Sequence, residues 1–114
     1  MDDPIAVAQF LVVLESGVER PVIAAVGRPY QAATGEWRCA AELSGLHGRL
    51  ADMGGEDSLQ ALCMAVSVLR SLLEDVTAKG GHVLDPSDRS ECQLDTIFGR
   101  LGSNANEAAK ARRS

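Results

Sequence analysis

The chain has 114 residues and a formal net charge of -5, with 46% hydrophobic and 24% charged residues. This length fits one domain, because a globule of this size buries roughly two thirds of the surface of its unfolded chain and holds a single core. The acid excess excludes a protein that works mainly on the phosphate backbone of nucleic acid, since that task needs clustered Lys and Arg. We therefore expect one globular domain with no nucleic-acid partner.

The amino-terminal segment and the cysteines indicate a cytoplasmic protein. Asp2 and Asp3 stand where a signal peptide carries Lys or Arg, and the apolar stretch 5–14 is too short to cross a bilayer. Three cysteines make an odd number without metal-like spacing, which is typical of buried thiols in a reducing compartment. We expect neither export nor a membrane anchor.

The first half of the chain predicts an antiparallel meander of three to four strands. Two runs rich in β-branched residues, 5–15 and 20–27, are separated by turn residues and predict a hairpin. The segment 28–35 has no alternation and contains Pro and Gly, so we expect a loop there. Residues 36–44 alternate between apolar and polar side chains and predict a half-buried strand, and 46–53 predict a shorter fourth strand paired back on it.

A long amphipathic helix is expected to begin near Asp57. Gly54 and Gly55 break the preceding strand, and Asp57 can cap the free amides of the first helical turn. Gln60 stands three residues after Asp57, where a capping box needs Glu or Gln, and Gly80 ends the helix. The apolar residues at helical spacing are Leu59, Leu62, Cys63, Val66, Leu69, Leu73 and Val76.

The last part of the chain predicts a short strand over 82–85 and a short helix. Ser87 and Asp88 are residues that cap helices. From Gly102 the sequence has no large apolar residue, so we expect a frayed or disordered tail over 103–114. The expected fold is one α+β domain over residues 1–102, with the meander packed on the long helix. The short C-terminal helix has one apolar stripe, formed by Leu94, Ile97, Phe98 and Leu101.

The first two predicted strands are apolar on both faces, whereas one helix covers only one face of a sheet. Monomers seldom expose large apolar patches, so something else must cover the second face. The two alternatives are the short C-terminal helix and a second copy of the chain. We expect a homodimer built on the second face or on the stripe of the short helix.

The residues that carry chemistry form no recognisable constellation. The two histidines and three cysteines lack the spacing of a zinc site, and no GxxxxGK[ST] or GxGxxG phosphate loop is present. We expect Cys39 and Cys63 to point inward and Cys92 to be exposed, without a base beside any of them. Paired carboxylates adjoin a terminus or a solvated helix face. The sequence therefore predicts no catalytic residues, no metal and no cofactor.

The end of the first hairpin is the best candidate for binding. Arg28, Tyr30, Trp37 and Arg38 gather two cations and two of the few aromatics there. This composition is typical of a binding hot spot. The alternative is that Trp37 anchors the core and that Arg38 pairs with a neighbouring Glu. Asp57 adds a polar group at the nearby helix start.

Four motifs together resemble a family of short, functionally uncharacterised bacterial proteins, a domain of unknown function. They are GRPY at 27–30, WRC at 37–39, GL at 45–46 and DSLQAL at 57–62. The resemblance covers residues 20–85 and leaves the second helix and the tail outside. It implies a bacterial source and an unassigned role, and it supplies no catalytic residues.

Two functional hypotheses follow. The first is a non-catalytic protein-interaction module that binds a protein partner through the sheet face or the region 28–38, and acid excess then favours a basic partner. Small acidic α+β proteins of this kind include immunity proteins that neutralise toxins, by analogy of class alone. The second is a small-molecule-binding protein or small enzyme with a pocket between the hairpin end and the helix start. That pocket would use Arg28, Tyr30, Arg38 and Asp57.

Overall fold

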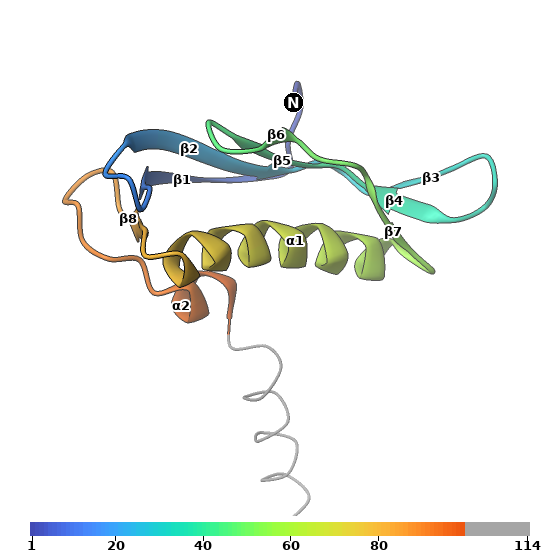
Figure 1. The fold of residues 1–114 in the computed structure, drawn as a ribbon. Coiled ribbons are helices and arrows are strands. Elements are labelled where there is room, and N and C mark those ends of the chain that lie inside the picture. The colour runs from blue at the N-terminus through green and yellow to red at the C-terminus, as the bar shows by residue number, and fades with distance from the viewer. Residues whose placement is uncertain (100–114) are drawn as a thin grey trace, which may run out of the picture.

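Two antiparallel sheets lie along one side of a long helix in residues 1–99, the part of the chain that this computed structural model describes (Figure 1). The fold is α+β, as the sequence predicts. A short second helix follows near the end of the described part. In chain order the elements are β1 (Ala6–Val13), β2 (Glu19–Val26), β3 (Tyr30–Gln31), β4 (Trp37–Cys39), β5 (Ala41–Ser44), β6 (Gly48–Arg49), β7 (Met53–Gly55), α1 (Ser58–Ala78), β8 (His82–Leu84) and α2 (Leu94–Phe98).

The larger sheet has the strand order β6-β5-β2-β1-β8, and the smaller one has the order β3-β4-β7. β1, β2, β5 and β6 form the predicted meander, and β8 returns after α1 to pair with β1. Pro21 in β2 has no amide hydrogen, but pairing between β2 and β5 begins only at Ile23. The proline therefore lies beyond that ladder.

The strand predicted over 36–44 bends at Ala40, which separates β4 from β5. The ladder continues through the bend, because Gly27 donates its N–H to the Ala40 carbonyl at 3.0 Å. Four residue steps lead from Val26 to Tyr30, whereas three lead between their partners Ala41 and Arg38. The extra residue between β2 and β3 is a β-bulge. A second β-bulge lies between β6 and β7, which pair with the other edge of β5 and β4. The two bulges turn the smaller sheet away from the larger one.

Two local predictions about these strands are wrong. The segment 28–35 is not entirely loop, because β3 lies within it and pairs with β4. Gly54 and Gly55 do not break the preceding strand, since both belong to β7 and also pair with β4. In both cases pairing with β4 imposes an extended conformation where the local pattern of Pro and Gly residues predicts a loop or a break.

The predicted start of α1 is confirmed. Asp57 is the N-cap, and its Oδ1 accepts a hydrogen bond of 2.7 Å from the Gln60 N–H. Gln60 reaches back with its side chain, and its Oε1 accepts the Glu56 N–H at 2.6 Å. The helix ends at Ala78, close to the predicted stop at Gly80.

The buried side of α1 differs from the predicted stripe in its first half. The helix buries Ala61 and Ala65 there, whereas Leu59 is 68% exposed and Cys63 is also exposed. The reason is a close approach of β7. A Cβ atom added to Gly55 would lie only 2.5 Å from the backbone nitrogen of Ala61, so this contact admits only small residues.

The core lies between α1 and the inner faces of the sheets. Leu43 on β5 and Leu73 on α1 are both fully buried in it. The alternation predicted for 36–44 is confirmed, because Trp37, Cys39 and Ala41 face the core while Glu42 lies on the other side. We call the side of the sheets away from α1 the outer face. The remaining core residues of the sheets include Phe10, Val12, Val22, Ala24, Val26 and Val83.

The second helix begins later than the predicted cap at Ser87 and Asp88. Ser87 and Asp88 do not cap it but form a turn before it, and α2 begins after Gln93 without a side-chain cap. It packs against α1 (Figure 1). Arg70 on α1 pairs with Asp95 on α2. α2 therefore does not cover the outer face. The predicted contribution of Leu101 and the predicted tail over 103–114 lie outside the described residues.

No helix in residues 1–99 is both long enough and apolar enough to span a membrane.

The contact between β7 and α1 leads to a prediction on stability. Gly55→Ala should lower the free energy of unfolding by about 1–3 kcal/mol, because the added methyl group meets helix backbone that cannot move aside alone. Gly54→Ala is the matched control, since its added Cβ has no neighbour closer than 3.9 Å. Urea denaturation of both variants measures the difference. Equal stability of the two variants would contradict the close packing.

Candidate functional site

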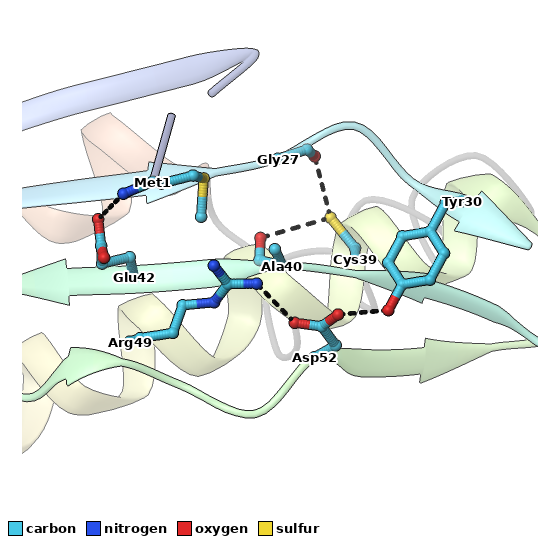
Figure 2. Close-up of polar contacts among 8 residues, drawn as sticks. All are labelled: Met1, Gly27, Tyr30, Cys39, Ala40, Glu42, Arg49 and Asp52. Atoms are coloured by element: carbon cyan, nitrogen blue, oxygen red, sulfur yellow. Dashed lines mark hydrogen bonds and ion pairs between the residues drawn. The ribbon is translucent and has the colours of Figure 1, made fainter. Parts of the chain in front are cut away.

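A group of polar side chains lies on the outer face where the sheets bend. Tyr30 and Arg38 are direct cross-strand partners on β3 and β4, so their side chains share this face. The Tyr30 hydroxyl donates to one carboxylate oxygen of Asp52, and the Arg49 guanidinium donates to the other at 3.1 Å (Figure 2). We call Tyr30, Arg38, Arg49 and Asp52 the bend cluster. Its carboxylate connects β3 to the segment between β6 and β7.

Neighbouring groups shift the pKa values of Asp52 and Tyr30 in opposite directions. The hydrogen bond from Tyr30, followed by Arg49 and Arg38, lowers the pKa of Asp52, and the same bond raises the pKa of Tyr30 above its usual value. Arg38 also donates to Glu36 and lowers the pKa of that carboxyl. Two guanidinium charges thus face two carboxylates. Each guanidinium of the bend cluster is therefore paired with a carboxylate, Arg38 with Glu36 and Arg49 with Asp52, and neither is left for binding an anion.

The stability that the hydrogen bond between Tyr30 and Asp52 contributes to the fold is limited to a range of pH. Because the pKa of Asp52 is lowered in the folded state, its contribution is present above the unfolded pKa and is lost as the pH falls through the folded value. Because the pKa of Tyr30 is raised, its contribution is present below the unfolded pKa and is lost as the pH rises through the folded value.

The neighbouring part of the bend is closed by the start of the chain. The α-ammonium group of Met1 donates to Oε2 of Glu42 at 3.0 Å, and the Met1 side chain is only 6% exposed (Figure 2). On the core side, the Cys39 thiol lies 3.3 Å from the Gly27 carbonyl oxygen and is fully buried. These contacts tie the start of the chain to β5 and the Cys39 thiol to the backbone just after β2.

The structure brings only some of the predicted site residues together. Tyr30 and Arg38 are neighbours on the outer face, and Arg28 is exposed in the connection just before β3. Trp37 faces the core on the opposite side of β4, as the alternative interpretation expected. Asp57 is engaged in the cap of α1. These five residues therefore do not surround one space.

Sequence reasoning missed Arg49 and Asp52. Both lie in or next to the predicted fourth strand, which does pair back on β4 and β5. Its two pieces are separated by a bulge that the pattern of residues does not indicate. Asp52 could have been placed beside Tyr30 only if the strand register on both sides of that bulge had been known.

Apolar side chains occupy the outer face of the larger sheet. Val7 on β1 is 60% exposed, and Ile23 on β2 is 43% exposed. Around them lie Gln9, Leu11 and Pro21, which share this face through the β1–β2 register. We call these five residues the outer patch. Since α2 packs on the helix side, none of the described helices covers this patch.

The hollows in the described part of the chain lie away from the predicted site. Four of the clearest have volumes of about 280, 180, 170 and 330 Å³. None of the four is lined by Arg28, Tyr30, Trp37, Arg38 or Asp57. Ligand pockets usually enclose about 300–1,000 Å³ with a few convergent polar groups. The predicted residues therefore line none of these four hollows.

The cysteines are distributed differently from the prediction. Cys39 is buried as expected, but Cys63 is exposed and Cys92 is half-buried. Burial raises the pKa of the thiols of Cys39 and Cys92, so neither is an activated nucleophile. Within residues 1–99, no group of three or more His, Cys, Asp or Glu side chains could hold a metal ion.

The fold and this surface define a small α+β domain with one sheet face that none of the described helices covers. Residues 7–93 match the model of a family described as a domain of unknown function (DUF6968), so the chain belongs to that family. The match confirms the family type expected from the motifs and extends beyond residues 20–85 at both ends. Neither the curated proteins nor the solved structures contain a match to this chain.

The bend cluster leads to a prediction about Asp52. Tyr30→Phe should raise the pKa of Asp52 toward its usual value of 3.8, because it removes the hydrogen bond that lowers this pKa most. Carboxyl ¹³C NMR titration measures the change. Asp88 is the internal control, since Ser90 lowers its pKa and the substitution does not affect that contact. An unchanged pKa of Asp52 would contradict the proposed hydrogen bond.

The cysteines lead to a prediction about thiol reactivity. In the native protein, a thiol reagent such as DTNB should label exposed Cys63 quickly, half-buried Cys92 slowly, and buried Cys39 only after unfolding. Absorbance kinetics on the variants Cys63→Ser and Cys92→Ser identify the phases. Fast labelling of Cys39 in the folded protein would contradict its burial.

Proposed function

We propose that this protein is a cytoplasmic, non-catalytic protein-interaction module that forms a homodimer and binds a protein partner through its outer face. The observation that supports this proposal most is the uncovered outer patch, in which Val7 and Ile23 remain largely exposed. Large apolar side chains gathered on one sheet face are typical of surfaces that bind other proteins.

The bend cluster supplies the polar part of the same surface. Tyr and Arg are among the residue types enriched at interfaces, and Tyr30 and Arg38 stand side by side on the outer face. Tyr30 is 43% exposed and is held by Asp52, so a partner meets an aromatic ring that is already positioned. An apolar centre with a polar neighbourhood is the usual anatomy of a protein interface.

Two features of this surface favour a protein partner over a small molecule. The predicted residues line none of the four hollows, and both guanidinium groups of the bend cluster are already paired with carboxylates. A net charge of -5 attracts a basic partner over long range. A basic protein toxin, neutralised by this chain as by an immunity protein, is one partner of that kind.

Photo-crosslinking tests the proposal. A photoreactive amino acid at Ile23 should capture a partner in cells, whereas the same amino acid at Ser71, which is exposed on α1, should not. The captured partner is identified by mass spectrometry, purified and titrated against the wild type and variants. Ile23→Asp should weaken binding at least about tenfold, because it places a charge in the apolar centre; Ser71→Asp should leave it unchanged.

Two outcomes would overturn this part of the proposal. One is the absence of any adduct specific to position 23 other than a second copy of the chain. The other is equal affinity of wild type and Ile23→Asp for the purified partner.

A further inference from the structure

The first half of β1 has an open edge. β1 pairs with β2 over its whole length, but β8 pairs with it only from Leu11 to Val13. In the described part of the chain, no strand lies beside residues 6–10 on the edge opposite β2. This edge offers backbone hydrogen-bonding groups to another strand.

The direction of these backbone groups follows from the ladder with β2. Leu14 donates its N–H to the Val18 carbonyl at 2.9 Å at the turn end of the β1–β2 pair. Backbone groups alternate along an antiparallel strand, so even-numbered residues of β1 bond to β2 and odd-numbered residues face the opposite edge. Val7 and Gln9 therefore direct their N–H and C=O groups to the open edge.

Residues 6–10 themselves carry none of the features by which sheets prevent association, although Pro86, which follows β8, lies beside one end of the edge, where it lines a hollow with Gln9 and Phe10. Residues 6–10 read AVAQF and contain no charge, proline or glycine. The opposite edge of the same sheet is β6, which has two residues, one glycine and one arginine. Short and charged edges resist pairing, whereas flat and uncharged edges favour it. The larger sheet thus has one edge suited to association.

Apolar side chains accompany the open edge on both faces of the sheet. On the outer face Val7 is 60% exposed. On the helix side, a hollow of about 180 Å³ lies beneath Ala6 and Ala8 and is also lined by Val66, Ile97 and Phe98. Ile97 on α2 is 44% exposed. A strand added at this edge would bring its own side chains over both apolar regions.

We infer that the open edge binds β1 of a second copy, antiparallel and about a two-fold axis at Ala8. This inference rests on the homodimer of the proposed function and specifies its contact. Val7 then exchanges two backbone hydrogen bonds with Gln9 of the partner subunit, and Gln9 does the same with the partner's Val7. Ala8 lies opposite its own copy in a pair without hydrogen bonds, where paired Cα atoms approach to about 4.5 Å.

The sequence of the edge favours a second copy over a foreign strand. Antiparallel pairing of one strand with itself is two-fold symmetric, so a single segment supplies both sides of the contact. The edge has no acidic residue to attract a basic partner, and it also brings no like charges together although the chain has a net charge of -5. The short, charged β6 edge prevents further addition, so the assembly closes as a dimer.

This dimer leaves the partner-binding surface free and doubles it. Residues paired in an antiparallel sheet share a face, so Val7 and Gln9 of the partner subunit lie on the same side. Both outer faces then point to the same side of one continuous sheet. A partner with two matching sites can bind both outer faces of the dimer. Its second contact is then intramolecular, which raises the overall affinity.

Substitution at Val7 tests the inference. Val7→Pro removes the N–H at the open edge and keeps the bonds of the even-numbered residues to β2, so it should convert the dimer into a monomer. Light scattering after size exclusion should give twice the chain mass of 12.0 kDa for the wild type and the single mass for the variant. Ile23→Asp, on the outer face and away from the edge, should remain dimeric.

Amide hydrogen exchange on the wild type gives a second test that needs no variant. The amides of Val7 and Gln9 should exchange slowly at high protein concentration and at least about tenfold faster on dilution to the monomer. Those of Ala6 and Ala8, which bond to β2, serve as an internal reference because they are protected in both states. Circular dichroism shows whether Val7→Pro is folded. If this variant is unfolded, hydrogen exchange on the wild type alone tests the edge contact.

The outcomes separate this inference from the proposed function. A wild type that is monomeric at high micromolar concentration would overturn both the homodimer and the edge contact. A wild-type dimer with rapidly exchanging Val7 and Gln9 amides, dissociated by Ile23→Asp, would overturn the edge contact alone and place the dimer on the outer face. In either case the crosslinking result for the partner stands independently.

Discussion

The close approach between α1 and β7 is the constraint on which the rest of the structure depends. Gly55 lies so close to the helix backbone that a Cβ atom cannot be added without movement, and Ala61 and Ala65 face the sheets where larger residues do not fit. β7 is held at this depth because it pairs with β4, the bent continuation of β5. The helix therefore turns its alanines inward and leaves Leu59 and Cys63 to solvent.

One long helix on one side has two consequences for the surface. The outer face of the larger sheet has no helix over it in the described part of the chain, because α2 packs against α1. β8 is too short to pair with all of β1, so the strand keeps an open edge over residues 6–10. The face offers side chains and the edge offers backbone groups. The proposed protein partner and the proposed second copy would therefore meet different chemistries on one small domain.

The residues of the candidate site could be predicted from the sequence only where the strands pair without a bulge. The alternation over 36–44 correctly separates Arg38 from Trp37, because successive side chains of a strand point to opposite faces. The neighbours Arg49 and Asp52 could not be placed in the same way. Each flanking strand contains an extra residue at the bend, and one residue of register decides which side chains meet.

The sequence by itself determined the α+β class, the cap and extent of α1 and the faces of the central strand. These depend on residues two to four positions apart, whose contacts form within one element. Only the tertiary structure decided which helix residues are buried, where α2 lies, that the outer face is uncovered and that half of β1 has an open edge. Those properties depend on contacts between different elements, such as β7 with α1 at Gly55 and Ala61, or β8 with β1. The pattern within one element does not record how far such a contact extends.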